Sequence, residues 1–278
     1  YEESPQRKAL EWLVNEDEPF PGFVNTNRLI QRFALATLFH STGGNESWRE
    51  HYNFLSNTPE CDWRVGNIHG YDEGVLCGED NQTVKRINLG NSTLVGTLPN
   101  ELGLLVDLKM LMLYENTLDG TLPPVLTNLS KLEVLDLWDN FLSGTLPFTP
   151  NNTNLPNIRE VLLGNNNFTG TLPRGLFMPT NMTSLDLSAN QFSGTLPTEI
   201  GNLFALQNLW LDENELSGQL PRNIGALTTL QQLSLFDNKF IGQLPSDIWA
   251  LTKLEWLDLE INVFRGQLPS NIGALTEL

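Results

Sequence analysis

Hydrophobic positions repeat along most of the chain with a period of 24 residues, apart from one interval of 26. Each copy reads Leu-x-x-Leu-x-Leu, in which alternate apolar side chains share one face of a short strand. A single copy cannot bury that face alone, so neighbouring copies are expected to stack and align their strands in a parallel sheet that lines a curved solenoid. Eight copies begin at Val84, Leu108, Leu132, Ile158, Met182, Leu206, Leu230 and Leu254.

Polar and small residues recur at fixed places in the same copies. An asparagine follows each strand in seven copies, whereas Ser92 takes its place in the first, which suggests a first copy adapted to its neighbour. We expect the asparagines to bond backbone groups of the turn and form a ladder through the core. They are Asn116, Asn140, Asn166, Asn190, Asn214, Asn238 and Asn262. A glycine that permits close backbone approach recurs at Gly96, Gly120, Gly144, Gly170, Gly194, Gly218, Gly242 and Gly266.

The end of each copy carries a family resemblance. The segment from Leu216 to Pro221 reads Leu-x-Gly-x-Leu-Pro, which is similar to the plant-type leucine-rich repeat, and the resemblance covers residues 84–278. It implies an α/β fold, a leucine-rich repeat solenoid with a curved, twisted parallel sheet on its concave face. Leu278 opens a ninth repeat without a polar closing cap, so we expect the native protein to continue.

Residues 1–83 do not repeat and are expected to form an N-terminal cap over the first repeat. Pro5 to Val14 and Arg28 to His40 are predicted to be amphipathic helices. Asn27 is the predicted N-cap of the second helix, which should end before Gly43 and Gly44. The interval of 26 residues predicts a polar loop over 148–156 that bulges outward.

The two cysteines lie in this predicted cap. Cys61-Asp62-Trp63 and Gly74-Val75-Leu76-Cys77 resemble elements of plant-type receptor ectodomains, in which the two cysteines are joined. The resemblance implies a Cys61–Cys77 disulfide, and a disulfide indicates a secreted or cell-surface protein. The stretch 28–44 also resembles caps of algal and diatom leucine-rich repeat proteins.

Seven Asn-x-Ser/Thr sequences are candidate N-glycosylation sites, although about four would arise by chance in this composition. The last three full repeats hold none, which would leave their surface free of glycans. The candidates are Asn45, Asn81, Asn91, Asn128, Asn151, Asn167 and Asn181.

Charge narrows the classes of partner. The formal net charge is −17 and the sequence pI is near 4.4, which disfavours nucleic acid and acidic membranes and favours cationic partners. No apolar run is long enough to span a membrane. The three histidines, His40, His51 and His69, have no nucleophile or metal-ligand spacing around them. We therefore expect no enzymatic activity, no catalytic residues, no metal and no cofactor.

The strand positions between the leucines are free to bind a ligand on the concave face. Repeats five to eight hold seven acids, three large aromatic residues and no Lys or Arg at these positions. Neighbouring acids such as Glu213 and Asp237 would repel one another, and a basic side chain from a partner or Ca²⁺ would relieve the repulsion. The alternative is that these acids only keep the surface soluble. The predicted ligand-binding residues are Trp210, Phe236, Trp256, Asp186, Asp212, Glu213, Asp237, Asp258 and Glu260, with a second patch at Tyr114 and Trp138.

Two classes of function fit these observations. The first is the ectodomain of a cell-surface receptor or receptor-like protein, which binds a peptide, glycan or partner protein and can engage a co-receptor ectodomain. The alternative is a secreted structural or adhesive matrix protein, or a secreted inhibitor. A membrane span beyond residue 278 would favour the receptor.

Overall fold

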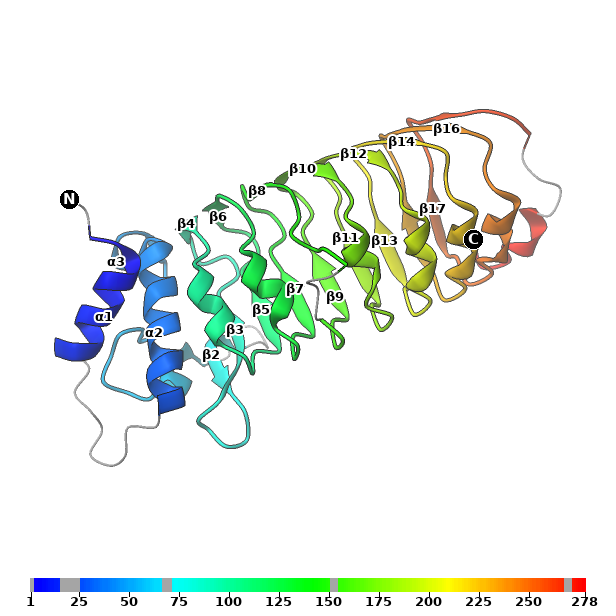
Figure 1. Cartoon of the computed structure of the whole chain (residues 1–278). Helices are drawn as coiled ribbons and strands as arrows, with labels where there is room; N and C mark the ends of the chain where they lie inside the picture. The colour runs from blue at the N-terminus through cyan, green and yellow to red at the C-terminus, as the bar shows by residue number, and fades with distance from the viewer. Residues whose placement is uncertain (1–2, 16–25, 67–71, 151–154, 268–271) are drawn as a thin grey trace.

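The repeats stack into an elongated, arched solenoid with helices at its N-terminal end (Figure 1). The computed structural model describes residues 3–15, 26–66, 72–150, 155–267 and 272–278. Within them, one strand from each repeat joins a ten-stranded sheet, called the concave sheet below. Its strands are β1 (Arg64–Val65), β2 (Glu73–Cys77), β3 (Val84–Asn88), β5 (Met110–Met112), β7 (Val134–Asp136), β9 (Glu160–Leu162), β11 (Ser184–Asp186), β13 (Asn208–Trp210), β15 (Gln232–Ser234) and β17 (Trp256–Asp258). This confirms the predicted leucine-rich repeat solenoid.

A second set of strands forms a lateral surface, where β4 pairs with β6 and a six-stranded sheet runs from β8 to β18. These strands are β4 (Val95–Thr97), β6 (Thr117–Asp119), β8 (Ser143–Gly144), β10 (Asn167–Thr171), β12 (Gln191–Thr195), β14 (Glu215–Gly218), β16 (Lys239–Gly242) and β18 (Val263–Phe264). Short 3₁₀ helices close the repeats: η2 (Asn100–Leu104), η3 (Pro124–Asn128), η4 (Arg174–Phe177), η5 (Thr198–Asn202), η6 (Arg222–Ala226), η7 (Ser246–Ala250) and η8 (Ile272–Ala274).

The repeated leucines form the core, as their spacing predicts. In the sixth repeat Leu206, Leu209, Leu211 and Leu216 have no exposed surface. The lateral turn needs glycine, because Gly194 has φ +80° and a Cβ there would lie 3.0 Å from Cγ2 of Thr171.

The asparagine ladder is present as predicted. Oδ1 of Asn190 accepts from the Phe168 amide at 2.9 Å, and its Nδ2 donates to the carbonyls of Leu163 and Ser188, both at 3.0 Å. The side chain therefore satisfies backbone groups of two successive repeats in the core.

Ser92 joins the first repeat to the N-terminal segment. Its hydroxyl lies 2.6 Å from the Tyr52 hydroxyl, and its carbonyl accepts from the Arg49 amide at 3.0 Å. The departure from asparagine thus serves the junction with the N-terminal segment, as the sequence suggests.

The N-terminal segment contains α1 (Pro5–Asn15), α2 (Thr26–Ser41) and α3 (Gly44–Ser47). Both predicted helices are present, and α2 ends before Gly43 as expected. The prediction that Asn27 is the N-cap is wrong, because Thr26 is already helical and Asn27 lies inside the first turn.

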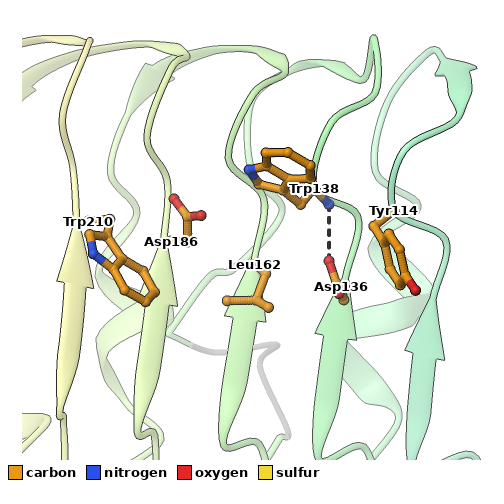
Figure 2. Close-up of a pocket in the computed structure, with 6 residues that line it drawn as sticks. All are labelled: Tyr114, Asp136, Trp138, Leu162, Asp186 and Trp210. Carbon is orange, nitrogen blue, oxygen red and sulfur yellow. Dashed lines mark hydrogen bonds between the residues drawn. The ribbon is translucent and has the colours of Figure 1, made fainter. Parts of the chain in front are cut away.

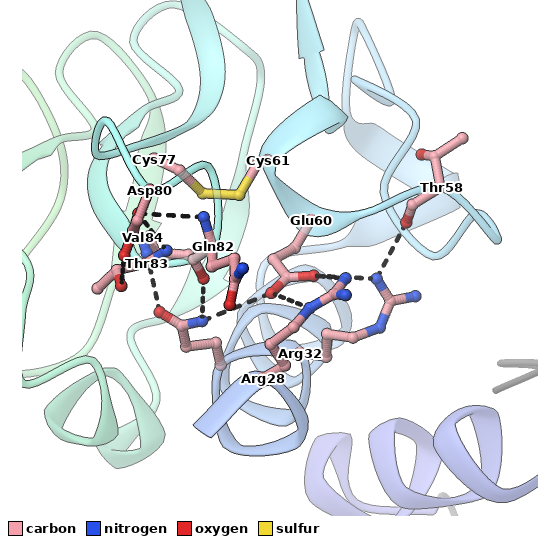
Figure 3. The surroundings of a disulfide bond; sticks show 11 residues. Arg28, Arg32, Thr58, Glu60, Cys61, Cys77, Asp80, Gln82, Thr83 and Val84 are labelled. Atoms are coloured by element: carbon pink, nitrogen blue, oxygen red, sulfur yellow. Dashed lines mark hydrogen bonds and ion pairs between the residues drawn. A yellow bond between two sulfur atoms is a disulfide. The ribbon is translucent and has the colours of Figure 1, made fainter. Parts of the chain in front are cut away.

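A buried ion cluster lies next to the disulfide of this segment (Figure 3). Cys61, in η1 (Glu60–Asp62), is bonded to Cys77 of β2 with the two Cα atoms 5.4 Å apart, which confirms the implied pairing. The side chain of Glu60 has no solvent exposure and accepts from Nη2 of Arg28 at 2.7 Å. Strand β2 pairs antiparallel with β3, so the concave sheet continues into the first repeat.

The loop in the longer repeat differs from its prediction. Phe148 and Leu155 are 2% and 3% exposed and belong to the core, so these two positions do not bulge outward. Both are large apolar side chains whose burial is favoured. Residues 151–154, including the sequon at Asn151, lie outside the described residues.

Candidate functional site

Strand register places the free positions of the concave sheet in rows. Asp136 of β7, Leu162 of β9 and Asp186 of β11 are register partners on adjacent strands, and Trp210 of β13 continues the row. The next row begins two residues later on the same face, because side chains alternate along the chain. It contains Tyr114, Trp138, Gly164, Ser188, Asp212, Phe236 and Glu260.

The two rows enclose a depression of about 310 Å³ in the middle of the concave sheet. In Figure 2 the Leu162 side chain lies at its centre, with Asp136 on one flank and Asp186 on the other. The indole of Trp138 extends from β7 toward β9, and that of Trp210 extends toward Asp186. The residues that form this depression, called the central pocket below, are Tyr114, Asp136, Trp138, Leu162, Asp186 and Trp210.

Local turns hold the two carboxylates. Oδ1 of Asp136 accepts from the backbone amide of Trp138 at 3.2 Å. Oδ1 of Asp186 accepts from the amide of Ser188 at 2.9 Å and from its hydroxyl at 2.6 Å. Each aspartate thereby holds the backbone of the second residue after its strand, which is the Asx-turn preference of this side chain.

Burial affects the protonation of this pocket. Burial, together with the nearby carboxylates of Glu160 and Asp186, raises the pKa of Asp136 to about 6. Burial also raises the pKa of Asp186 and of Tyr114. At neutral pH the pocket is therefore negatively charged, although burial and the neighbouring carboxylates disfavour this charge.

A glycine opens the pocket between the strands. Gly164 follows Leu162 on the same face, and a Cβ at Gly164 would lie 2.7 Å from Oδ1 of Asp186 and 2.8 Å from Oγ of Ser188. Its missing side chain leaves room for the Asp186 turn.

The predicted site residues separate into two regions. Tyr114 and Trp138 line the central pocket together with Trp210 and Asp186. Trp256 lies on β17 as the register partner of Gln232 and is 58% exposed. With Asp258 and Glu260 it borders a separate hollow that also contains Leu278. The structure therefore places Trp210 and Trp256 in different hollows.

The remaining predicted residues border neither the central pocket nor the hollow at Trp256. Asp212 and Phe236 are half-buried beyond the strand ends, while Glu213 and Asp237 are exposed in turns with φ of 52° and 48°. In the ranges that the structure describes, no group of three or more His, Cys, Asp or Glu is arranged to hold a metal ion. The binding role of all these residues stays a prediction.

The prediction omitted Asp136 and Leu162, although both belong to the pocket. The sequence does contain a signal for both residues, because they occupy the same position in repeats three and four, between Tyr114 of repeat two and Trp210 of repeat six. Acidic and aromatic residues are most frequent in the C-terminal repeats, whereas the pocket depends on which side chains are neighbours across strands.

Two further properties concern the surface. The described candidate glycosylation sites are all exposed, namely Asn45, Asn81, Asn91, Asn128, Asn167 and Asn181. Among the described residues, no helix is both long and apolar enough to cross a membrane.

Comparison with known families and sequences agrees with the repeat pattern. The model of the family described as Leucine Rich Repeat matches residues 131–152, 181–203, 205–227 and 229–251. None of the curated protein sequences compared matches the chain.

Solved structures of plant receptors share the fold. The ectodomain of the membrane receptor kinase GASSHO1/SCHENGEN3 from Arabidopsis thaliana, in complex with CASPARIAN STRIP INTEGRITY FACTOR 2, is 40% identical over 72% of this chain, with a TM-score of 0.68. The Arabidopsis receptor kinase HAESA, in complex with the peptide hormone IDA and the co-receptor SERK1, is 28% identical over 91% of the chain, with a TM-score of 0.67. PEPR1, in complex with AtPEP1, is 27% identical over 92%, with a TM-score of 0.69.

The chain spans only part of these relatives, corresponding to 24%, 44% and 37% of their respective lengths. Repeat sequence, solenoid and disulfide together identify the chain as a leucine-rich repeat protein of the plant type, similar to plant receptor ectodomains.

Proposed function

We propose that the chain is an extracellular ligand-recognition module, part of a cell-surface receptor or receptor-like protein, that binds a peptide or partner protein in its concave sheet. The observation that carries this proposal is the central pocket, where Tyr114, Trp138 and Trp210 surround Leu162 on a rigid sheet. Aromatic residues dominate the energy of many interfaces because they bury a large area with little loss of conformational freedom.

The comparisons support the peptide class of ligand. HAESA is in complex with a peptide hormone and a co-receptor, and RGFR1, 31% identical over 71% of the chain, is described as a plant peptide hormone receptor. By analogy the partners of this chain are a peptide and, in a signalling complex, a second ectodomain. The family model describes a repeat and not a catalytic domain, and the matched GASSHO1/SCHENGEN3 structure is the LRR ectodomain of a receptor kinase, so a non-enzymatic role of this chain is part of the proposal.

Other parts of the proposal concern location and organisation. The disulfide favours an oxidising compartment, which supports a secreted or cell-surface location. Residues 1–83 are proposed to act as a capping unit and residues 84–278 as the repeat unit that presents the ligand surface.

Selection from a random peptide library displayed on phage tests the proposal. The secreted chain is immobilised, and the recovered peptides are measured against Trp138→Ala with Trp210→Ala. Phe204→Ala is the control, because Phe204 is 57% exposed and precedes β13 outside the central pocket.

We expect peptides that bind the wild-type chain and the control, and that lose at least tenfold in affinity for the double variant. Circular dichroism verifies that each variant is folded. Failure to recover any saturable binder, or equal binding to the double variant, would contradict the proposal.

A further inference from the structure

The central pocket has negative charge without a positive partner. Within the described ranges, none of the ion pairs includes Asp136, Glu160 or Asp186. Acids elsewhere do pair across repeats, as Nζ of Lys109 does with Glu133 at 2.7 Å. The pocket therefore lacks the cation that this protein supplies to other acids.

The three carboxylates surround one apolar side chain. Asp136 and Asp186 are the register partners of Leu162 on either side, so each lies about one strand spacing, ~4.8 Å, from it along the sheet. Glu160 precedes Leu162 by two residues on the same strand and the same face. A cation placed above Leu162 would be near all three acids.

The two aspartates retain acceptor capacity. In the described part of the chain, the hydrogen bonds of both aspartate side chains use Oδ1, through the turns with Trp138 and Ser188. An ionised carboxylate can accept on both oxygens, so Oδ2 of each is available to a donor. The turns also fix the carboxylates before any ligand arrives.

The aromatic walls favour an organic cation. Trp138 extends its ring toward the strand of Leu162 and Trp210 extends its ring toward Asp186 (Figure 2), and indole faces attract cations through the ring quadrupole. A guanidinium is planar, weakly hydrated and able to donate to two carboxylates at once, whereas an ammonium is a compact and strongly hydrated charge. An apolar floor with aromatic walls suits the guanidinium better.

The N-terminal segment contains the same arrangement with its cation in place. The guanidinium carbon of Arg32 lies 5.0 Å from the ring centroid of Trp12 and 4.8 Å from that of Trp63. Its Nη1 lies 3.4 Å from Oε2 of Glu60. Two indoles and a carboxylate therefore hold an arginine inside this same chain.

We infer that the central pocket binds an arginine side chain of the ligand, with the guanidinium above Leu162, between Asp136 and Asp186, and against the Trp138 and Trp210 rings. This inference rests on the proposed function, because it specifies the chemistry of the peptide recognised there. Burial opposes the ionisation of Asp136 by raising its pKa to about 6, and a bound guanidinium supplies the charge that favours the ionised form.

Two small probes of equal shape test the charge requirement. N-acetyl-arginine amide and the neutral N-acetyl-citrulline amide are titrated into the whole chain at pH 7.5. The indole N–H signals of Trp138 and Trp210 are followed by NMR, after assignment with single Trp→Phe variants. We expect the arginine probe to shift both signals and to bind at least tenfold more tightly than the citrulline probe.

A pair of charge-matched variants locates the site. Asp136→Asn with Asp186→Asn is expected to abolish the preference for arginine. Asp119→Asn with Asp247→Asn removes the same charge from exposed acids in β6 and η7, outside the central pocket, and is expected to retain the preference.

Equal affinity for the two probes would overturn the inference, because shape would then explain the binding. An equal loss of the preference for arginine in both double variants would also overturn it, because diffuse charge would then explain the preference. The phage-selected peptides separate this from the proposed function. Peptides that require Trp138 and Trp210 but contain no arginine would refute the inference and leave the proposed function standing. Binding of the arginine probe without any peptide binder would show that the pocket holds a guanidinium and would contradict the proposed function.

Discussion

Oδ1 of Asp136 accepts a hydrogen bond of 3.2 Å from the backbone amide of Trp138. One turn therefore orders both a carboxylate and an indole of the central pocket. Asp186 and Ser188 repeat the arrangement two strands away. Pocket geometry thus depends on two local turns of the same kind, of which the second has an additional hydrogen bond from the Ser188 hydroxyl.

Asp136→Asn is expected to stabilise the protein at neutral pH. Burial raises the pKa of Asp136 to about 6, so the folded state binds more protons than the unfolded state between about pH 4 and pH 6, and ionisation weakens folding as the pH rises through this range. Asparagine keeps an acceptor for the Trp138 amide and removes that cost. We expect a gain of up to about 3 kcal/mol in the free energy of unfolding at pH 7.5 and almost none at pH 4.

Urea denaturation of both proteins at the two pH values measures this gain. An equal difference at pH 4 and pH 7.5 would show that Asp136 titrates normally in the folded state.

Trp210→Ala is expected to weaken peptide binding more than Trp256→Ala does. Trp210 lines the central pocket, whereas Trp256 is 58% exposed near the other hollow. Truncation of a central aromatic anchor costs about 2 kcal/mol or more, and truncation outside the anchor costs far less. Calorimetric titration with a selected peptide compares the two, and a larger loss in Trp256→Ala would move the site to the C-terminal hollow.

Asn190→Ala is expected to lower the free energy of unfolding by about 2–4 kcal/mol. It leaves the Phe168 amide and the carbonyls of Leu163 and Ser188 without their side-chain partner in the core. Asn202→Ala, at an exposed position in η5, should change stability by less than about 0.5 kcal/mol. Similar values for the two variants in urea denaturation would argue against a structural role for the ladder.

Glu60→Gln is expected to destabilise the N-terminal segment by about 3–5 kcal/mol, because it removes the charge that faces Arg28 and Arg32 in a buried cluster. Glu199→Gln is the matched control. Its carboxylate pairs with Arg174 at 3.3 Å on the surface, where such a pair contributes less than about 1 kcal/mol. Hydrogen exchange of α2 reports the local change, and unaltered protection in Glu60→Gln would contradict the prediction.

Reduction of the disulfide is expected to cost about 3 kcal/mol, because the bond between Cys61 and Cys77 restricts the unfolded chain. The chain has two cysteines, so dithiothreitol acts on this bond alone. Thermal unfolding should shift down in the wild-type protein and remain unchanged in Cys61→Ser with Cys77→Ser. The same melting temperature for reduced and oxidised wild-type protein would exclude a stabilising bond.

Much of the fold could be predicted because repeat physics is local and additive. The spacing of Leu206, Leu209 and Leu211 determines which face is buried, and each repeat contacts mainly its neighbours. The role of Asn190 follows from the same regularity. Prediction was weaker where no period exists, as at Asn27 and at Phe148, since helix boundaries and loop burial depend on what packs against them.

The sequence by itself determined the solenoid, the sheet and the set of side chains that the concave surface presents. Only the tertiary structure decided which of those side chains meet. Trp138 and Trp210 are 72 residues apart in sequence, yet the register of β7, β9, β11 and β13 brings them to one pocket with Leu162 between them. The direction of each indole and the burial of Asp136 arise from packing across strands, where neighbours lie one repeat apart rather than side by side in the chain.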